Sequence, residues 1–196
     1  MAVKEMNDIK LIQTLKGFNK SYFTIFDLGK ILDVKKDSLY VTLNRLVKSG
    51  VLIRLKRGIY QPEFKEPELE KTAGELYYPS YLSFESALSR FGVLNLIPYS
   101  LSFATTRKTK SMSLLERQVV YRHLKQKLFF GFTHEEGLYI AEPEKALLDL
   151  VYLRSLGKAE IPSEEMDLRS LSEKTLREYA GQFPSRVMEV LEQLLS

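Results

Sequence analysis

The sequence predicts an α+β protein of two domains. Apolar residues recur at helical spacing through most of the first fifty positions, and two short stretches of alternating apolar and charged residues follow. Beyond residue 80, strand-like and helix-like stretches are mixed. The intervening run QPEFKEPELEKTAGELYYP holds three prolines and five glutamates, which is typical of a linker. We therefore expect an N-terminal domain at 1–62, a linker at 63–79 and a mixed α/β C-terminal domain at 80–196.

Two helices are indicated in the first half of the N-terminal domain. One is expected from Glu5 to Gly17, where apolar residues recur at helical spacing. The next should begin after Thr24, a residue type that caps helix N-termini, with Asp27 in the favourable first turn. It would run to about Leu32, and its expected buried side consists of Phe26, Leu28, Ile31 and Leu32.

A third helix is expected over SLYVTLNRLVKSG, with Asp37 as its N-cap and Gly50 at its C-terminal end. Its buried face would carry Leu39, Leu43, Leu46 and Val47. The opposite face and its flanks carry Ser38, Tyr40, Val41, Thr42, Asn44, Arg45 and Lys48, preceded by Lys35 and Lys36. Methyl, hydroxyl, amide and guanidinium groups of this kind read base edges in the major groove of DNA.

A basic hairpin is expected directly after this helix. Val51, Ile53 and Leu55 would form one face of its first strand, against Arg54 and Lys56 on the other. Arg57 and Gly58 make the turn. Cations on such a hairpin can neutralise DNA phosphates. Three helices and a basic hairpin predict a winged helix-turn-helix that binds DNA; the alternative is the same fold used for protein contacts.

The charge distribution agrees with a nucleic-acid-binding N-terminal domain. Residues 1–60 hold 12 Lys+Arg and 5 Asp+Glu, whereas the remaining 136 residues hold 17 and 20. A basic module joined to a slightly acidic body is typical of proteins with an anionic partner. A solvated basic face is the alternative interpretation.

Composition excludes several other classes. The chain has no cysteine and only two histidines, His123 and His134, so thiolate metal sites are excluded and we expect neither a metal site nor a cofactor. The sequence lacks an apolar run approaching the roughly 18–20 residues of a membrane-spanning helix, and the stretch MAVKEMNDIK lacks a signal-peptide core. We therefore expect a cytoplasmic protein without membrane contact.

The C-terminal domain is expected to alternate helices and strands. Ser83 would cap a helix that Gly92 closes, and Pro143 would open a long helix that Gly157 closes. Strands are expected at 99–106, 118–124 and 138–141, and further helices at 170–179, opened by a capping-box pattern at Ser170, and at 185–195.

A second basic region lies within this domain. Between residues 107 and 127 seven cations accompany the single acidic residue Glu116. They are Arg107, Lys108, Lys110, Arg117, Arg122, Lys125 and Lys127. The region could be a second nucleic-acid contact, a surface for an acidic partner, or an exposed hairpin with solvated lysines.

An enzyme, in particular a metal-dependent nuclease, is the rival interpretation. Glu142, Glu144, Lys145 and Asp149 lie within eight residues, and nucleases need converging carboxylates to hold Mg²⁺. These residues fall on one expected helix, however, and Lys145 and Asp149 have the spacing of ordinary helix-surface pairing. The sequence also lacks the G-x-S-x-G, phosphate-loop and dinucleotide-binding motifs. We therefore expect no catalytic site.

Three stretches, spread over about residues 5–155, resemble one family. LVKSGVLIRLKRGIYQP is similar to the wing of the AbiEi-type antitoxins, whose hairpin reads G-x-L-x-R-x-x-R-G-x-Y. YLSFESALSRFGVLNLIP resembles the helix that opens their second domain, and AEPEKALLDLVYL resembles their late A-x-P-E-K-A-L-x-D helix. The TTR at 105–107 also matches a strand-end element of that family.

The resemblance implies a transcriptional repressor that is the antitoxin of an abortive-infection, type IV toxin–antitoxin pair. Such proteins regulate their own operon and oppose a toxin that resembles nucleotidyltransferases. The implied partner is operator DNA, with inverted repeats that a dimer or cooperatively bound copies would occupy. The family's DNA-contacting positions correspond here to Ser38, Val41, Thr42, Arg45, Lys48, Arg54, Lys56 and Arg57.

Overall fold

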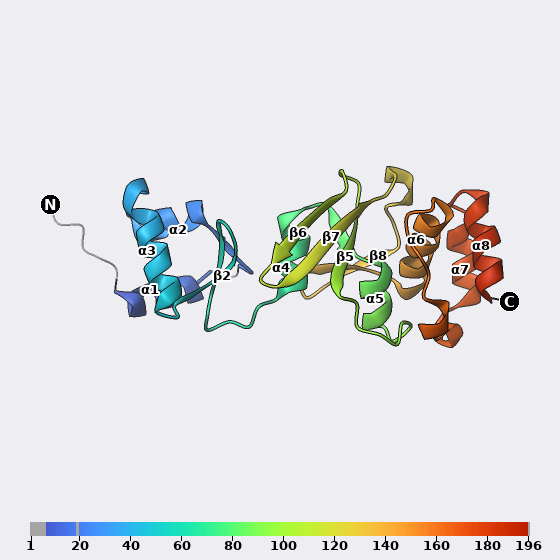
Figure 1. Ribbon diagram of the computed structural model, residues 1–196, viewed down its shortest axis with the longest axis horizontal. Coiled ribbons are helices and arrows are strands. Elements are labelled where there is room, and N and C mark those ends of the chain that lie inside the picture. Colours follow the sequence, from blue (N-terminus) through green and yellow to red (C-terminus); the bar gives the residue numbers. More distant parts are fainter. Residues whose placement is uncertain (1–6, 19, 196) are drawn as a thin grey trace. The chain divides into compact units, whose positions relative to one another are not determined.

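The computed structural model describes residues 7–18 and 20–195 and confirms a mixed α+β protein. The chain divides into two compact units, Met1–Thr72 and Ala73–Ser196 (Figure 1). Helix α4 (Leu69–Leu76) occupies part of the segment expected to be a linker. None of the helices in the described part of the chain is long and apolar enough to cross a membrane.

The N-terminal unit consists of three helices followed by a hairpin. The helices are α1 (Asp8–Lys16), α2 (Ile25–Leu32) and α3 (Lys36–Lys48), and the hairpin strands are β2 (Leu52–Lys56) and β3 (Ile59–Pro62). The short strand β1 (Phe23–Thr24) pairs antiparallel with β3, which gives a three-stranded sheet of order β1-β3-β2. Sequence reasoning did not predict β1, because two residues carry no periodic pattern.

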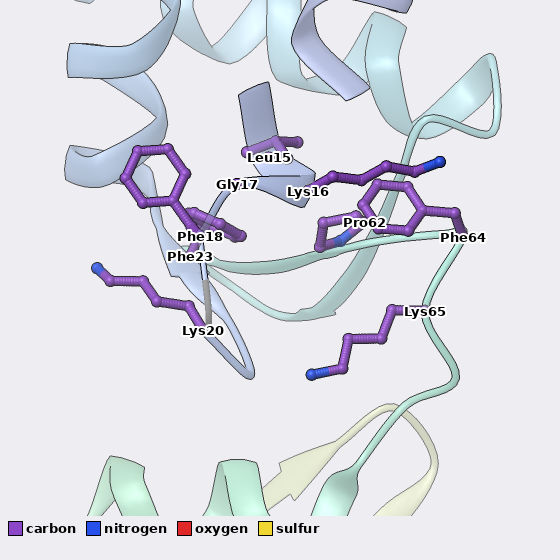
Figure 2. Close-up of a pocket in the computed structure, with 9 residues that line it drawn as sticks. All are labelled: Leu15, Lys16, Gly17, Phe18, Lys20, Phe23, Pro62, Phe64 and Lys65. Carbon is purple, nitrogen blue, oxygen red and sulfur yellow. The ribbon is translucent and has the colours of Figure 1, made fainter. Parts of the chain in front are cut away.

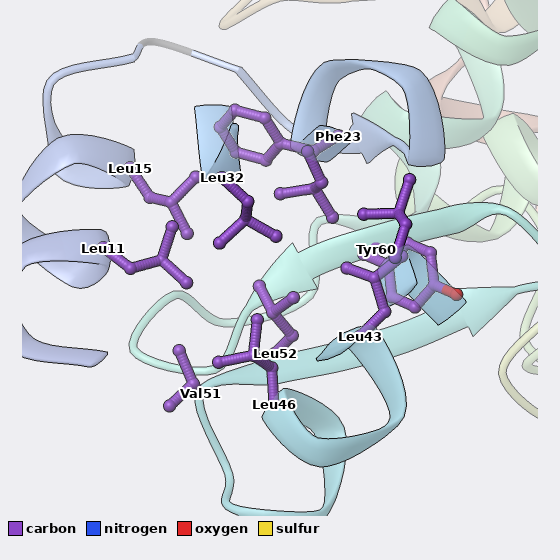
Figure 3. Packing of buried hydrophobic residues seen from close by; sticks show 11 residues of the cluster. Leu11, Leu15, Phe23, Leu32, Leu43, Leu46, Val51, Leu52 and Tyr60 are labelled. Carbon is purple, nitrogen blue, oxygen red and sulfur yellow. The ribbon is translucent and has the colours of Figure 1, made fainter. Parts of the chain in front are cut away.

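One apolar cluster holds the N-terminal unit together (Figure 3). Each helix contributes leucines, and the sheet contributes residues from all three strands or their ends. The members are Leu11, Leu15, Phe23, Leu28, Leu32, Leu39, Leu43, Leu46, Val51, Leu52 and Tyr60. Because burial of leucine side chains is worth roughly 1.5–3 kcal/mol each, this cluster fixes the orientation of α3 relative to the hairpin.

Several local predictions for this unit need correction. The expected helix start at Glu5 lies outside the described residues, and α1 begins at Asp8 behind the N-cap Asn7. Helix α3 has Lys35 rather than Asp37 at its N-cap position, without a side-chain cap, because Asp37 already lies in the first turn. Phe26 is 67% exposed instead of buried, and the Lys30 ammonium lies 4.3 Å from its ring centroid.

The start of α2 agrees with the prediction from Thr24 and Asp27. The Thr24 hydroxyl accepts a hydrogen bond from Asp27 N at 3.1 Å, and the Asp27 carboxylate accepts one from Thr24 N at 2.8 Å. This reciprocal pair is a capping box. Burial raises the pKa of Asp27, but hydrogen bonds from Thr24 and Lys20 outweigh this effect. The pKa of Asp27 therefore lies below its ordinary value of 3.8.

We expect Thr24→Ala to lower the free energy of unfolding of the N-terminal unit by about 1 kcal/mol, because one helix donor loses its partner. Since the pKa of Asp27 is lowered in the folded chain, its contribution is complete at neutral pH and is lost as the pH falls through its folded-state pKa. Urea unfolding at pH 7 and pH 3 measures both effects. An equal loss in Thr14→Ala, whose hydroxyl instead donates to Lys10 O within α1, would contradict the capping role.

The C-terminal unit is built on a six-stranded sheet of order β6-β7-β5-β4-β9-β8. Strands β5 and β7 are parallel, as are β4 and β9, and the other neighbours are antiparallel. The strands are β4 (Ser80–Leu82), β5 (Ser100–Thr105), β6 (Lys110–Leu114), β7 (Arg117–His123), β8 (Phe132–Glu135) and β9 (Leu138–Ala141). The helices that follow α4 are α5 (Phe84–Arg90), α6 (Pro143–Ser155), α7 (Glu173–Ala180) and α8 (Ser185–Leu195).

Two predictions for this unit are wrong in detail. Helix α7 begins after Ser172, whose hydroxyl accepts a hydrogen bond from Thr175 N at 3.2 Å, rather than after Ser170, which lies in a short 3-10 turn. Leu147, Leu150 and Val151 would mark a single buried side of helix α6 by their spacing, yet the helix is buried around almost its whole circumference, because it lies between α5 and the helices α7 and α8.

Candidate nucleic-acid interface

Helix α3 presents its predicted outer face to solvent. Leu39, Leu43 and Leu46 are buried on the inner side, with 7%, 0% and 0% of their surface exposed. On the outer side Val41 is 70% and Tyr40 is 55% exposed. A large apolar side chain that is mostly exposed at the centre of a basic helix is available to contact thymine methyl groups. Thr42 is half-buried. The other outer residues are exposed, namely Lys35, Lys36, Ser38, Asn44, Arg45 and Lys48.

The two hydroxyl groups on this face donate to the backbone of the helix itself. The Ser38 hydroxyl donates to Lys35 O and the Thr42 hydroxyl to Ser38 O, each at 3.0 Å. With their hydrogens engaged, both oxygens present lone pairs outward. They can therefore accept hydrogen bonds from amino groups of bases but are poorly placed to donate.

Arg45 is held by an ion pair that sequence reasoning did not foresee. Two nitrogens of its guanidinium donate hydrogen bonds to the carboxylate of Asp8 at the start of α1, at 3.2–3.3 Å. The side chains of Arg45 and Asp8 are 54% and 33% exposed, and exposed pairs of this kind are worth about 0–1 kcal/mol. Arg45 can therefore exchange Asp8 for a base or phosphate at small cost.

The hairpin places its cations at a tight, irregular tip. The register of β2 and β3 shifts between Arg54 and Lys56, so the strict alternation expected from the sequence fails and both Leu52 and Leu55 are buried. Gly58 has φ +80°, a conformation that favours glycine, and its carbonyl accepts a hydrogen bond from Ile25 N at 2.9 Å. Arg54 and Arg57 are exposed, whereas Lys56 is half-buried.

The second basic region only partly forms an outward surface. Arg122 is half-buried and pairs with Glu85 at 3.0 Å, and Arg117 donates to Pro98 O at 2.6 Å. Arg107 donates to Tyr78 O and lies over the Tyr77 ring. These three arginines therefore have structural contacts. The lysines of the region remain exposed, namely Lys108, Lys110, Lys125 and Lys127.

Lys145 and Asp149 form a buried ion pair rather than the helix-surface pair that we expected. Both side chains are 0% exposed. The Asp149 carboxylate accepts hydrogen bonds from Tyr81 Oη at 2.8 Å, from Ser83 Oγ at 2.9 Å and from Lys145 Nζ. Burial raises the pKa of Asp149 and lowers that of Lys145, and the attraction between the two opposes both shifts. The signal for this cluster was present in the sequence, since apolar residues surround both charges on every side of the helix.

The residues that suggested a nuclease do not converge. The Glu142 carboxylate accepts a hydrogen bond from Tyr179 Oη, and the Glu144 carboxylate accepts one from Ser172 N, whereas Asp149 lies in the buried cluster. Across residues 7–18 and 20–195, no group of three or more acidic or histidine side chains is placed to hold a metal ion. Glu142, Glu144 and Asp149 therefore contact different partners and do not form one metal site.

Comparisons with known proteins bear on both units. The crystal structure of the RV2827C protein from Mycobacterium tuberculosis resembles the chain with a TM-score of 0.66 and 13% sequence identity, over 98% of this chain and 78% of that one. At this identity the likeness concerns the fold alone. None of the curated protein sequences matches the chain. The family of transcriptional regulators described as AbiEi antitoxins matches residues 19–62, a segment that includes α2, α3 and the hairpin. The resemblance inferred from the sequence is thus confirmed for the segment that includes the hairpin stretch: residues 19–62 are similar to the AbiEi antitoxin family of transcriptional regulators.

Proposed function

We propose that this protein is a sequence-specific DNA-binding transcriptional repressor that acts as the antitoxin of a toxin–antitoxin pair. In this proposal the N-terminal unit is a winged helix-turn-helix, with α3 as the recognition helix and the β2–β3 hairpin as the wing. The observation that carries it is the outer face of α3, where exposed Val41 and Tyr40 lie among cations, within the segment that matches the AbiEi family.

Affinity and specificity would come from different side chains. Arg54, Lys56 and Arg57 on the hairpin would neutralise phosphates, so binding should fall steeply with salt. Val41, Thr42 and Arg45 would contact base edges, with each good contact worth roughly 1–3 kcal/mol. The exposed lysines of the second basic region would add a sequence-independent contact.

The remaining parts of the proposal concern assembly and partners. Domains at 1–62 and 80–196 would separate operator binding from the action on a toxin that resembles nucleotidyltransferases. Repression of the protein's own operon would need two copies, as a dimer or through cooperative binding, on inverted half-sites. The C-terminal unit would act without catalysis.

The test is binding to the DNA upstream of the protein's own gene. Fluorescence anisotropy compares this duplex with a scrambled duplex of equal length at 50 and 200 mM salt. Preferential binding that weakens with salt supports the proposal. If the two duplexes bind equally at every salt concentration, the N-terminal unit is a protein-contact module instead.

Replacing Arg57 by alanine is expected to weaken the binding of operator and scrambled DNA by the same factor, because a phosphate contact carries no sequence information. The slope of log K against log salt should fall by about one unit. Lys158→Ala is the matched control, since Lys158 is an exposed cation outside both basic regions. Loss of preference for the operator in Arg57→Ala would instead assign this side chain to base reading.

A further inference from the structure

The N-terminal unit contains a hollow that the DNA-binding proposal does not use. It has a volume of about 300 Å³ and is bounded by two segments of chain. One comprises residues 15–18 at the end of α1, together with Lys20 and Phe23, and the other is the chain where β3 ends. Figure 2 shows the lining side chains: Leu15, Lys16, Gly17, Phe18, Lys20, Phe23, Pro62, Phe64 and Lys65. This volume lies at the lower end of those that hold small ligands.

The lining combines positive charge with aromatic faces. It contributes three lysines, and the lining residues that the structure describes include no acidic side chain. Phe18 and Phe64 are 45% and 46% exposed, on different sides of the hollow (Figure 2). Ammonium groups attract phosphate, while an exposed phenylalanine ring can stack on a planar heterocycle. The pairing of the two features therefore selects a ligand that has both a ring and a phosphate.

The lysines can turn to a ligand without a large loss elsewhere. Lys16 Nζ lies 5.2 Å from the centre of the Phe64 ring. Lys20 pairs with Asp27 at 3.2 Å and Lys65 pairs with Glu68 at 2.6 Å, and all four side chains are between 28% and 48% exposed. Exposed pairs contribute only about 0–1 kcal/mol. A phosphate could therefore displace the carboxylates from one or both of these lysines.

The hollow is separate from the face proposed to bind DNA. Arg45 of α3 contacts Asp8 at the first residue of α1, whereas the hollow begins at Leu15, near the last residue of that helix. The hairpin tip lies at the start of β3, whereas Pro62, which lines the hollow, ends that strand. The rise along the helix from Asp8 to Leu15 and the length of strand from Ile59 to Pro62 are each about 10 Å. A small ligand in the hollow would therefore leave α3 and the hairpin tip uncovered.

We propose that this hollow binds a nucleoside monophosphate, with the base stacked on Phe64 or Phe18 and the phosphate held by Lys16, Lys20 and Lys65. A volume of about 300 Å³ suits a ligand of the size of a mononucleotide. Binding would join the end of α1 to the chain that leaves β3. This inference does not depend on whether α3 reads DNA.

Titration calorimetry of the full chain with each of the four ribonucleoside monophosphates tests the proposal. We expect at least one of these nucleotides to bind. Phe64→Ala and Lys16→Gln should each weaken its binding about tenfold, within the range seen when a stacking aromatic is removed. Helix α2 offers a matched control, because Lys30 lies over the exposed Phe26 ring outside the hollow. Phe26→Ala and Lys30→Gln should change the affinity less than about twofold.

Three results would overturn the proposal. One is the absence of binding heat for all four nucleotides up to millimolar concentration. Another is inorganic phosphate binding as tightly as the best nucleotide, because this would mean that the base is not recognised. The last is equal weakening by the α2 control variants. Changes in the NMR chemical shifts of the Phe18 and Phe64 rings on nucleotide addition would report the site directly. These changes should persist in a Val41→Asp variant, whether or not that variant binds DNA.

Discussion

Replacing Asp149 by alanine is expected to lower the free energy of unfolding of the C-terminal unit by about 3–5 kcal/mol, because removal of one partner leaves a buried charge uncompensated. Among the described contacts, the ammonium of Lys145 would then keep one hydrogen-bond acceptor. This acceptor is Tyr81 Oη, at 2.9 Å. The aromatic rings around it, those of Tyr81, Phe130 and Phe183, cannot replace a carboxylate. Urea unfolding followed by circular dichroism measures the loss.

Two further variants make this prediction specific. Asp167→Ala removes an aspartate from an ion pair with Arg169 whose side chain is 89% exposed, together with a cap on a short 3-10 turn, and it should lower stability by no more than about 1 kcal/mol. Lys145→Met combined with Asp149→Leu removes both charges, and it should recover much of the stability lost in Asp149→Ala, since apolar replacements of buried pairs are often tolerated. If the double variant is no more stable than Asp149→Ala, lost packing or the hydrogen bonds of Tyr81 and Ser83 explain the effect better than the unpaired charge.

Replacing Val41 by aspartate is expected to lower operator preference about tenfold and to weaken operator binding about a hundredfold, because one base contact is lost and the new charge repels DNA phosphates. Because the Val41 side chain is 70% exposed, the fold of the N-terminal unit should not change. Anisotropy titrations measure the affinity, and thermal unfolding checks the fold.

The matched control is Ile97→Asp. Ile97 is also a strongly exposed aliphatic side chain, at 84%, but it lies in the C-terminal unit. It introduces the same charge and should leave operator affinity within about twofold. Equal weakening by both variants would show that net charge rather than the α3 face governs binding. Undiminished operator preference in Val41→Asp would show that Val41 does not read bases.

Features specified by local chemistry could be predicted from the sequence. Thr24 is the expected N-cap, with Asp27 three residues on in the first turn, and α8 occupies the expected residues 185–195. The α3 face was predictable because leucines four and seven residues apart must share a buried side. These features depend on residues close in the chain.

Features specified by distant partners were not predictable. Strands β1 and β4 have two and three residues, too few for a periodic pattern, and they exist because a neighbouring strand pairs with them. Asp8 binds Arg45 across 37 positions of sequence, and Tyr81 reaches Asp149 across 68. The hollow near Phe64 likewise depends on two segments that meet only in the folded chain.

The six-stranded sheet ends in the short strands β6 and β8, and exposed edges of this kind are templates on which a foreign strand can add. Here β6 opens with the exposed Lys110, and β8 ends with the exposed His134 and Glu135. Charged side chains on short edge strands oppose such addition and the aggregation that follows from it. A protein that engages the C-terminal unit is therefore expected to bind through its helices and loops, and the sheet itself is protected against growth into fibres.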